Sequence, residues 1–411
     1  MSLDLADLWT RADAAAADHR SIALLGLASP VLMERAALAC VAVITGLRDG
    51  RPVHVLCGPG NNGGDGVAIA RILHHRGVPV QVHLLAERAG PGLAEQVALA
   101  ERLGVTVQRG LPPPLIGPAV VVDAMLGTGA APPLREPYLA GVAWANAALA
   151  TRVAVDLPTG VDADTGAIPG PAVRADFTVT FERSKPGLHL TPARAFVGVV
   201  IVASIGLIDP VASRPPGATA PIRLVAPAEV RAWILGLPAG AHKGQRGHLG
   251  VLGGSAGTPG AAVLCGAAAL RAGAGLVTIV SGDPEVQAQL IAHRPELMVT
   301  GRDQPPAARA DALVVGPGLT READRLGLAN LYADDPRPAV WDASALTEIT
   351  GATTGGPRVL TPHPAEAARL LSLRTGQSWT AQQVQGERLA AARALASHTG
   401  AVVVLKGEGT V

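Results

Sequence analysis

The stretch Val53-His-Val-Leu-Cys-Gly-Pro-Gly-Asn-Asn-Gly-Gly-Asp-Gly66 decides the fold of the first half of this chain. A β-branched strand, Val53–Leu56, runs into a glycine-rich turn and then into a helix-like segment, Gly66–Arg76. Glycine permits left-handed backbone and close approach of main-chain amides to a ligand, and the helix start adds unpaired N–H groups. The stretch therefore predicts a βαβ unit with a pyrophosphate seat, and a turn that serves only the connection is the alternative. The residues of this seat are Asn61, Asn62, Gly63, Gly64 and Asp65.

The alternation of short β-branched runs and helix-like segments continues along the chain. It predicts parallel strands that are buried on both faces, and therefore an α/β architecture. The Pro- and Gly-rich segment Val211–Pro221 interrupts the pattern and predicts a linker between two domains, residues 1–212 and 222–411. The expected strands are Val53–Leu56, Val80–Leu85, Ala119–Val122, Arg152–Val155 and Phe177–Phe181, then Leu249–Leu252, Leu276–Val280, Ala312–Val315, Ala339–Trp341, Arg358–Leu360 and Ala401–Leu405.

The composition narrows the class of protein. Hydrophobic residues make up 48% of the chain and aromatic residues only 2%, so the core must be aliphatic. A formal net charge of +1 gives no support to a nucleic-acid or anionic-membrane partner, and we expect neither. Cys40, Cys57 and Cys265 have no disulfide or metal spacing, and the acidic N-terminus is unlike a secretory signal. We therefore expect a soluble cytoplasmic protein.

Acidic and hydroxyl side chains follow two more strands of the first half. Asp123 comes directly after one predicted strand, and Asp156 and Thr159 come after the next. Because the carboxyl ends of parallel strands meet at one edge of a sheet, we expect these side chains near the glycine-rich turn. Oxygen atoms of Asn62, Asp123 and Thr159 suit a monovalent or hard divalent cation. Loop or helix capping is the alternative role for both aspartates.

Four motifs of the first half occur in a characteristic order. They are Gly-Pro-Gly-Asn-Asn-Gly-Gly-Asp-Gly, Asp-Ala-x-Leu-Gly-x-Gly, Asp-x-Pro-Thr-Gly-Val-Asp-Ala-Asp-x-Gly and Thr180-Phe-x-x-x-Lys185-Pro-Gly187. This order resembles the NAD(P)H-hydrate epimerase domain of the bifunctional NAD(P)H-hydrate repair enzymes. The resemblance implies a Rossmann-like domain that binds the hydrated dinucleotide and a potassium ion, the ion being held by Asn62, Asp123 and Thr159.

The same resemblance assigns roles to single residues of the first half. It implies that Asp156 transfers a proton at the hydrated carbon, with Lys185 as its charge partner. It also implies a run of substrate contacts in the turns after the strands. These contacts are Asn61, Asn62, Gly63, Gly64, Asp65, Gly127, Thr128, Gly129, Ala130, Ala131, Pro132, Pro133 and Asp156.

Two positions depart from the family pattern. Where the family usually reads Leu-Met-Glu-Asn-Ala-Gly, this chain has Arg35 in place of the asparagine. We expect this long charged side chain close to ligand or subunit contacts. Thr159 stands where serine is usual, and it keeps the hydroxyl group.

Five further motifs follow in the second half. They are His-Lys243-Gly, Gly-Gly-Ser255, Gly-Pro-Gly318-Leu, Thr-Pro-His363-Pro-x-Glu and Lys406-Gly-x-Gly-Thr410. Their order resembles the ADP/ATP-dependent NAD(P)H-hydrate dehydratase domain, which has a ribokinase-like α/β fold. The resemblance implies that Ala261, Gly318 and His363 contact the hydrated dinucleotide.

The resemblance also implies a nucleotide site in the second half. It implies ADP or ATP with Mg²⁺, with Lys243 as a further phosphate contact, because main-chain amides and a lysine charge suit phosphates. Taken without the family, His363 is compatible with a structural histidine and Asp342 with a helix cap. The implied nucleotide-binding residues are Lys406, Gly407, Glu408, Gly409 and Thr410.

The second half departs from its family in two places. Ser344 stands where the family has the second aspartate of Asp-Ala-Asp-Ala-Leu. The family continues past Lys-Gly-x-Gly-Thr to a Gly-Gly-x-Gly-Asp turn that carries the catalytic aspartate. We therefore expect the sequence to be incomplete after Val411.

The function expected from these motifs is the repair of hydrated NADH and NADPH. The first domain would interconvert the R and S hydrates as an isomerase, and the second would dehydrate the S hydrate as a nucleotide-dependent lyase. One alternative is a ribokinase-like small-molecule kinase fused to a nucleotide-binding domain. Another is a catalytically degenerate dinucleotide-binding protein, which Arg35 would mark. We expect a homo-oligomer, since open-edged α/β domains often assemble.

Overall fold

The computed structural model describes residues 7–130, 133–208, 221–234, 236, 240, 242–302 and 309–411. Contacts divide the chain into two compact units, Met1–Arg231 and Ala232–Val411. The predicted linker, Val211–Pro221, lies outside the described residues except for Pro221. The sequence predicts that the second domain starts at residue 222, whereas the contacts assign residues up to Arg231 to the first unit. One reason is that Ile222–Arg223 pairs with Asp7–Leu8 of the first unit.

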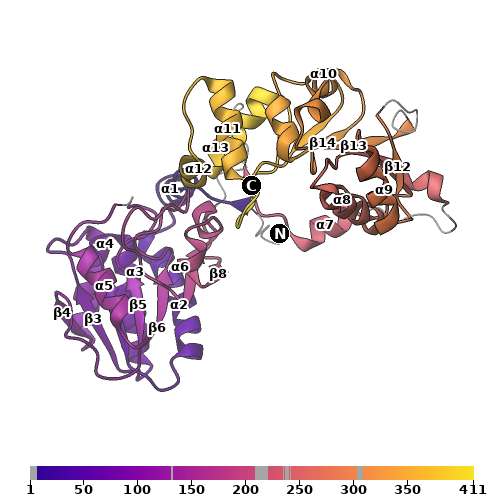
Figure 1. Cartoon of the computed structure of the whole chain (residues 1–411). Helices are drawn as coiled ribbons and strands as arrows, with labels where there is room; N and C mark the ends of the chain where they lie inside the picture. The colour runs from indigo at the N-terminus through magenta and orange to yellow at the C-terminus, as the bar shows by residue number, and fades with distance from the viewer. Residues whose placement is uncertain are drawn as a thin grey trace. The chain divides into compact units, whose positions relative to one another are not determined.

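The first unit is built on a seven-stranded sheet in the order β4-β3-β2-β5-β6-β7-β8 (Figure 1). All neighbouring strands are parallel. The strand order reverses between β2 and β5, and parallel sheets bind ligands beyond the carboxyl ends of the strands at such a point. The strands are β2 (Val53–Cys57), β3 (Val80–Leu84), β4 (Thr106–Arg109), β5 (Ala119–Ala124), β6 (Ala150–Val155), β7 (Phe177–Phe181) and β8 (Val199–Ala203).

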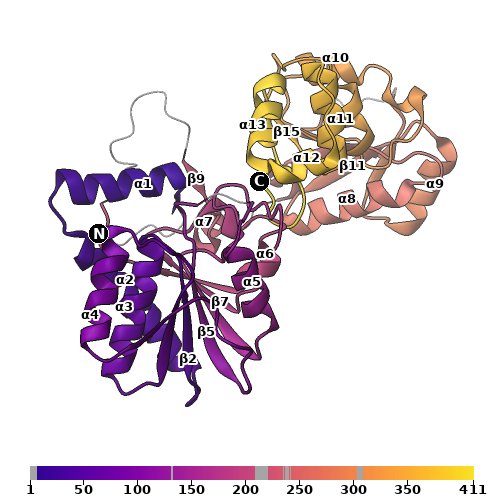
Figure 2. The same cartoon turned by 90° about the vertical axis from the view of Figure 1, so that its left-hand side faces the viewer.

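Helices cover both faces of this sheet. Figure 2 shows α2 (Ser29–Leu47), α3 (Asn61–His75) and α4 (Pro91–Arg102) on one face, and α5 (Tyr138–Ala147) and α6 (Arg194–Val197) on the other. Both layers pack on aliphatic side chains of the strands, as the composition predicts.

Helix α2 is long and apolar enough to cross a membrane by length and composition alone. Its buried side chains, which include Leu32, Cys40 and Ile44, belong to the main core of the first unit. This packing accounts for the apolar composition of the helix, since a core-facing helix needs such a face.

The chain start also belongs to the first unit. Strand β1 (Asp7–Leu8) pairs antiparallel with β9 (Ile222–Arg223), and Leu8 forms an isolated bridge with Ser184. Helix α1 (Arg11–His19) follows, with Thr10 and Asp13 forming a capping box at its start. It continues into a π-helical turn, η1 (Arg20–Leu24), and a 3₁₀ turn, η2 (Pro186–Leu188), follows β7.

The second unit has its own parallel sheet, in the order β12-β11-β10-β13-β14-β15-β16. The strand order reverses between β10 and β13. The strands are β10 (His248–Leu252), β11 (Leu276–Val280), β12 (Met298–Thr300), β13 (Ala312–Val315), β14 (Ala339–Trp341), β15 (Arg358–Leu360) and β16 (Val402–Val403). The helices are α7 (Pro227–Trp233, at the division), η4 (Lys243–Arg246), α8 (Pro259–Ala272), α9 (Pro284–His293), η6 (Glu322–Arg325), α10 (Leu328–Asp334), η7 (Ala343–Glu348), α11 (Pro364–Thr375), α12 (Ala381–Gly386) and α13 (Arg388–Thr399).

The predicted α/β class with two parallel halves is confirmed, with differences at element ends. Helix α3 begins at Asn61 rather than Gly66, so residues 61–66 of the glycine-rich motif are already helical and only residues 58–60 precede the helix. Strand β16 is shorter than the predicted Ala401–Leu405. The prediction lacks β4, β8 and β12, which are edge strands with little buried surface, and the two-residue strands β1 and β9.

Candidate active sites

A cavity of about 450 Å³ opens at the carboxyl edge of the first sheet, where the strand order reverses. The turns after β2, β5 and β6 line it, together with parts of α1 and α2. Residues that the sequence predicts as one site, far apart in the chain, therefore share one cavity. The predicted residues that line it are Asn61, Asn62, Asp65, Gly127, Thr128, Gly129, Ala130, Asp156 and Lys185.

The two predicted catalytic residues form a buried ion pair in this cavity. Lys185 Nζ lies 2.6 Å from Asp156 Oδ1, and the two residues are 2% and 9% exposed. The ammonium also donates to Thr180 Oγ1 at 2.7 Å and to the Phe181 carbonyl at 3.3 Å. The Thr128 amide donates to Asp156 Oδ2 at 3.2 Å. The carboxylate is thus held from both sides.

Opposing effects set the ionisation of Asp156. Burial disfavours the charged carboxylate, but the Lys185 charge and the hydrogen bonds from Lys185, Thr128 and Thr180 outweigh it, so the net pKa is lowered. Asp156 also has a left-handed backbone, with φ of 67°, which is rare outside glycine. Its amide donates to the Val179 carbonyl at 2.7 Å, which holds this conformation. Such an enforced backbone is typical of functional residues.

Two of the three predicted cation ligands are in direct contact. Thr159 donates to Asp123 through its hydroxyl at 2.7 Å and through its amide at 2.8 Å, and both residues are buried. Burial raises the pKa of Asp123 to about 6, although the hydrogen bonds from Thr159 and Met125 act against it. The third ligand, Asn62, has a buried side-chain nitrogen with no hydrogen-bond partner among the described residues. Amide, carboxylate and hydroxyl groups fit an oxygen-ligated monovalent cation.

Two other acids line the same cavity. Burial, followed by the charges of Asp156 and Asp18, raises the pKa of Asp65 well above its usual range. Asp18, on α1, has an exposed side chain, yet the surrounding protein and the charge of Asp156 raise its pKa as well. The cavity therefore holds carboxyl groups whose ionisation differs, which is the arrangement that acid–base chemistry requires.

The remaining predicted contacts of the first unit lie elsewhere. Gly63 and Gly64 are buried in the first turn of α3 and do not line the cavity. A side chain at Gly63 would collide with the Gly58 carbonyl, so this glycine permits close packing of helix on turn. Pro133 is exposed, and Ala131 and Pro132 lie outside the described residues. A substrate contact for these five residues stays a prediction.

The sequence reasoning misses a buried acid that shapes the cavity wall. Both carboxylate oxygens of Glu182, which is 2% exposed, accept from Ser204 Oγ, and Oε2 also accepts from the amides of residues 205–207 at 2.9–3.1 Å. Ile205 and Leu207 of this segment line the cavity. Arg35, the departure from the family pattern, donates to the Ile205 carbonyl at 3.0 Å and is not among the lining residues. It therefore supports the wall from behind.

In the second unit, two predicted substrate contacts lie together where its strand order reverses. Gly318 follows β13, and Ala261 lies in the first turn of α8, which follows β10. Gly318 has φ of 73°, and a side chain there would press on the Thr258 carbonyl and the Ala261 methyl group. Only glycine fits this position, because the backbone is left-handed and its neighbours are close.

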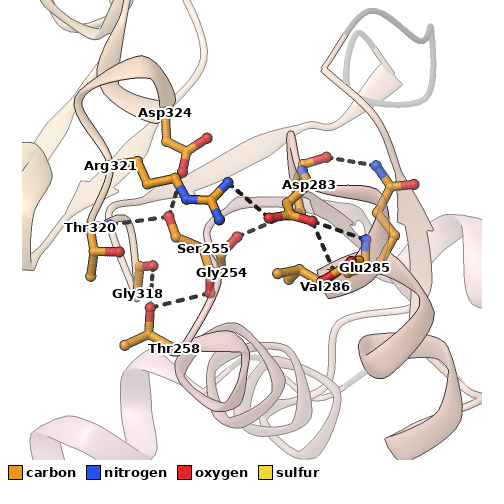
Figure 3. Close-up of polar contacts among 12 residues, drawn as sticks. Gly254, Ser255, Thr258, Asp283, Glu285, Val286, Gly318, Thr320, Arg321 and Asp324 are labelled. Atoms are coloured by element: carbon orange, nitrogen blue, oxygen red, sulfur yellow. Dashed lines mark hydrogen bonds and ion pairs between the residues drawn. The ribbon is translucent and has the colours of Figure 1, made fainter.

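A hydrogen-bond network fixes the loops that carry these residues (Figure 3). Ser255 donates to Asp324 at 2.5 Å and accepts from the Thr320 amide at 3.1 Å. Thr258 donates to the Gly318 carbonyl at 2.8 Å. Figure 3 also shows Arg321 reaching Asp283, at 2.9 Å, where Asp283 caps α9. The loops after β10, β11 and β13 are thereby tied into one rigid edge.

The third predicted contact, His363, caps helix α11. Its Nδ1 accepts from the amides of Ala365 and Glu366 at 3.2 and 3.4 Å, and Glu366 reaches back to the His363 amide. His363 therefore has a structural role as the cap of α11, which is one of the two roles that the sequence leaves open. The side chain is 51% exposed at the carboxyl end of β15, so a substrate contact there stays a prediction.

The predicted nucleotide loop follows β16 at the same edge of the sheet. Lys406 Nζ lies 2.6 Å from Asp342 Oδ1, with both side chains partly exposed. Gly407 and Gly409 have positive φ values of 141° and 69°, which the tight turn requires. Lys243 lies at the opposite edge: its carbonyl abuts Gly275, which directly precedes β11. Lys243 thus precedes β10 instead of following a strand, and a phosphate contact for it stays a prediction.

Two parallel α/β units, each with polar and glycine residues gathered at its switch point, define a two-domain enzyme of the nucleotide-binding class. Residues 29–187 match the family model described as YjeF-related protein N-terminus, and residues 249–411 match NAD(P)H-hydrate dehydratase. The chain belongs to the family of bifunctional NAD(P)H-hydrate repair enzymes. The family predicted from the motifs is thus confirmed.

Relatives of this chain are similar over nearly its whole length. The bifunctional NAD(P)H-hydrate repair enzyme of Escherichia coli is 36% identical, over 98% of this chain and 78% of its own length. The enzyme of Moorella thermoacetica is also 36% identical, over 98% and 81%. Among solved structures, the ADP/ATP-dependent NAD(P)H-hydrate dehydratase from Bacillus subtilis, co-crystallised with ATP and Mg²⁺, is 31% identical over 44% of this chain and 66% of its own, with a TM-score of 0.39.

Proposed function

We propose that the first unit interconverts the R and S hydrates of NADH and NADPH. The observation that carries this proposal is the 2.6 Å pair of Lys185 and Asp156 in the cavity at the switch point of the sheet. The same cavity presents the amide side chains of Asn61 and Asn62 and the backbone of the Gly127 turn, which suit a dinucleotide. Family membership supports the same activity.

Asp156 is the proton-transfer group in this proposal. Its lowered pKa favours the carboxylate, which can take a proton from water as that water adds to the planar ring carbon left when the original hydroxyl group has departed. In the reverse direction, the protonated carboxyl returns this proton to the hydroxyl group, which leaves as water. The ring nitrogen then shares its electron pair with the planar carbon, and water can add again from either face. Lys185 keeps the carboxylate oriented and ionised.

Asn62, Asp123 and Thr159 would hold a potassium ion beside this pair. The buried contact between Asp123 and Thr159 supports this proposal, and Asn62 would contribute its side-chain oxygen. The ion would supply a fixed positive charge close to the substrate, which carries phosphate groups.

The second unit is proposed to dehydrate the S hydrate with ADP or ATP and Mg²⁺. The terminal phosphoryl group would pass to the hydroxyl of the hydrate, which makes a better leaving group. Loss of phosphate and of a proton from the adjacent carbon then restores the ring double bond. Lys406 and the Gly407–Thr410 loop would bind the phosphates, and Ala261, Gly318 and His363 would contact the dinucleotide. The B. subtilis dehydratase that was co-crystallised with ATP and Mg²⁺ supports this choice of nucleotide.

One experiment tests both halves. Chemically hydrated NADH, separated into R and S forms, is incubated with protein expressed from its complete coding sequence, and chromatography follows the two forms. We expect R and S to equilibrate without nucleotide, and reduced-nicotinamide absorbance to recover only after ADP or ATP with Mg²⁺ is added. Asp156→Asn should stop the equilibration and leave the recovery from pure S hydrate intact. Equilibration at the uncatalysed rate with the unsubstituted protein would refute the first half of the proposal.

We further propose that the protein acts in the cytoplasm as a homo-oligomer, on small-molecule hydrates and without a nucleic-acid or membrane partner. The net charge of +1 and the free thiols of Cys40, Cys57 and Cys265 support this compartment and ligand class. Val199, which is 56% exposed on the edge strand β8, supports assembly. Light scattering on the purified protein would test it, since a monomer has a mass of 41.5 kDa.

A further inference from the structure

A buried arginine lies directly beneath the proposed nucleotide loop. Arg388 begins helix α13 and is 1% exposed. Its guanidinium donates to the carbonyls of Leu405 and Lys406 at 2.9 and 3.1 Å, to that of Gly409 at 3.2 Å, and to Gln385 Oε1 at 2.5 Å. Three of its four acceptors are therefore main-chain oxygens of one loop.

These contacts turn the loop's amides away from the arginine. In a trans peptide the C=O of one residue and the N–H of the next point in opposite directions. Because the carbonyls of Lys406 and Gly409 face Arg388, the amides of Gly407 and Thr410 face the other side of the loop. Neither amide has an acceptor within the described part of the chain. Two free amides on the outer side of one loop offer hydrogen bonds to an anion, as the amides of a nest do.

The loop is closed around the same arginine. Leu405 and Val411 exchange backbone hydrogen bonds at 2.8 and 3.2 Å, and the Lys406 amide donates to the Pro362 carbonyl at 2.8 Å. A side chain at Gly407 would lie 3.2 Å from the guanidinium nitrogens, so the guanidinium and the loop backbone are in contact. Thr410 Oγ1 donates to the Gly407 carbonyl at 2.7 Å, so this carbonyl has its hydrogen bond within the loop.

Within the described part of the chain, neutral oxygens alone accept hydrogen bonds from Arg388. All four groups that accept from it are carbonyl or amide oxygens. Burial lowers its pKa, yet a guanidinium stays charged at neutral pH. A buried positive charge under a loop of outward-facing amides favours an anion on the outer side, since charges in a protein interior are weakly screened.

We propose that Arg388 is a positioning residue for the nucleotide phosphates. It holds the carbonyls of residues 405–409 inward, so that the amides of Gly407 and Thr410 and the Lys406 ammonium face the phosphates. Its charge adds to their attraction for the ligand. This inference rests on the proposed nucleotide site at Lys406–Thr410.

The second unit contains a matched control, Arg358. This arginine, at the start of β15, is 2% exposed and also donates to main-chain carbonyls, among them those of Tyr332 at 3.0 Å and Arg337 at 2.7 Å. It lies at the amino ends of the strands, at the opposite edge from the nucleotide loop. Replacing Arg358 therefore removes a buried carbonyl-binding guanidinium of the same sheet without touching the loop.

The test measures binding of ADP, ATP and adenosine, with Mg²⁺, to the full chain by calorimetry. We expect Arg388→Met to weaken ADP and ATP about tenfold or more, because charged hydrogen bonds are lost under the phosphates, and to leave adenosine within about twofold. Arg388→Lys keeps the charge but not the set of contacts, and should weaken ADP about threefold to fivefold. Arg358→Met should lower the unfolding midpoint and leave all three affinities within about twofold.

The outcomes separate this inference from the proposed function. If Lys406→Met leaves ADP affinity unchanged, the nucleotide site itself is misplaced and both proposals fall. If Lys406→Met weakens ADP and Arg388→Met does not, only the role of Arg388 is overturned. Equal losses for adenosine and ADP, or equal losses in Arg388→Met and Arg358→Met, would show that the effect is general destabilisation. Should Arg388→Met fail to fold, Arg388→Lys decides by the same comparison of adenosine with ADP.

Discussion

Replacing Lys185 with methionine tests the buried pair on which the first site depends. The substitution keeps the length and volume of the side chain and removes the charge that lies 2.6 Å from Asp156. Removing one partner of a buried ion pair costs about 3–5 kcal/mol, because the other charge is left uncompensated. Asp156 keeps its hydrogen bonds from Thr128 and Thr180, so we expect a loss near the lower end, about 3 kcal/mol at pH 7.5.

The sign of the pH dependence follows from the ionisation of Asp156. In the unsubstituted protein its folded pKa is lowered, so the pair contributes stability above the unfolded pKa of about 3.9 and loses it as the pH falls through the folded value. In Lys185→Met, burial without the lysine places the folded pKa above the unfolded one. The penalty is therefore absent below the unfolded pKa of about 3.9 and grows as the pH rises through the folded pKa. At pH 5 it should be smaller than at pH 7.5.

Urea denaturation of the full chain at pH 5 and pH 7.5 measures these values. The double variant Lys185→Met/Asp156→Asn removes both charges and should recover most of the stability at pH 7.5. Both variants should lose epimerisation by about a hundredfold or more, since the single variant loses the ion pair that keeps Asp156 ionised and the double variant also loses the carboxylate. A loss below about 1 kcal/mol that does not change with pH, or a double variant no more stable than the single one, would refute this reasoning.

Three other substitutions test separate parts of the first unit. Asp123→Asn should abolish the rise in melting temperature that potassium gives the unsubstituted protein over a large organic cation, and an undiminished rise would remove Asp123 from the cation site. His83 is buried and its folded pKa is lowered to about 4 by burial and by His54, so stability should fall as the pH drops from about 6.5 toward 4. In His83→Gln, urea denaturation should show a smaller decrease in the free energy of unfolding between pH 7 and pH 5 than in the unsubstituted protein. An equal decrease would contradict the assignment of this pH dependence to His83. Glu182→Gln weakens the hydrogen bonds to residues 205–207, so it should cost about 2 kcal/mol and raise the KM for the hydrate, whereas an unchanged KM would separate this wall from the substrate.

The fold was predictable to the extent that it depends on local signals. Runs such as Ala119–Val122 are fully buried in parallel strands, and such strands read as continuous apolar stretches in the sequence. Element ends were less predictable. Helix α3 begins at Asn61, within a glycine-rich motif that has poor helix propensity, because Gly63 and Gly66 let the helix pack closely on the strand turns. That close packing is a tertiary contact which no local pattern records.

The first site was predictable in its residue types and only partly in its geometry. Asp156 and Lys185 stand out because each lies in a motif after a strand. Glu182 lies in the same motif as Lys185, yet its role in holding residues 204–207 depends on the loop after β8, which no motif marks. Asp18 enters the cavity from α1, a helix whose position depends on β1 and on the bridge between Leu8 and Ser184.

By itself, the sequence determined two α/β halves, the family and the residues that could carry its chemistry, because strand patterns and glycine-rich turns are local properties of the chain. Only the tertiary structure decided which of those residues meet. It joined Lys185 to Asp156, placed the Lys243 backbone beside Gly275 at the start of β11, and placed Arg388 under the nucleotide loop. The physical reason is that parallel strands bring distant turns to one edge of a sheet, and the strand order and the packing of helices then set which side chains lie within hydrogen-bond distance.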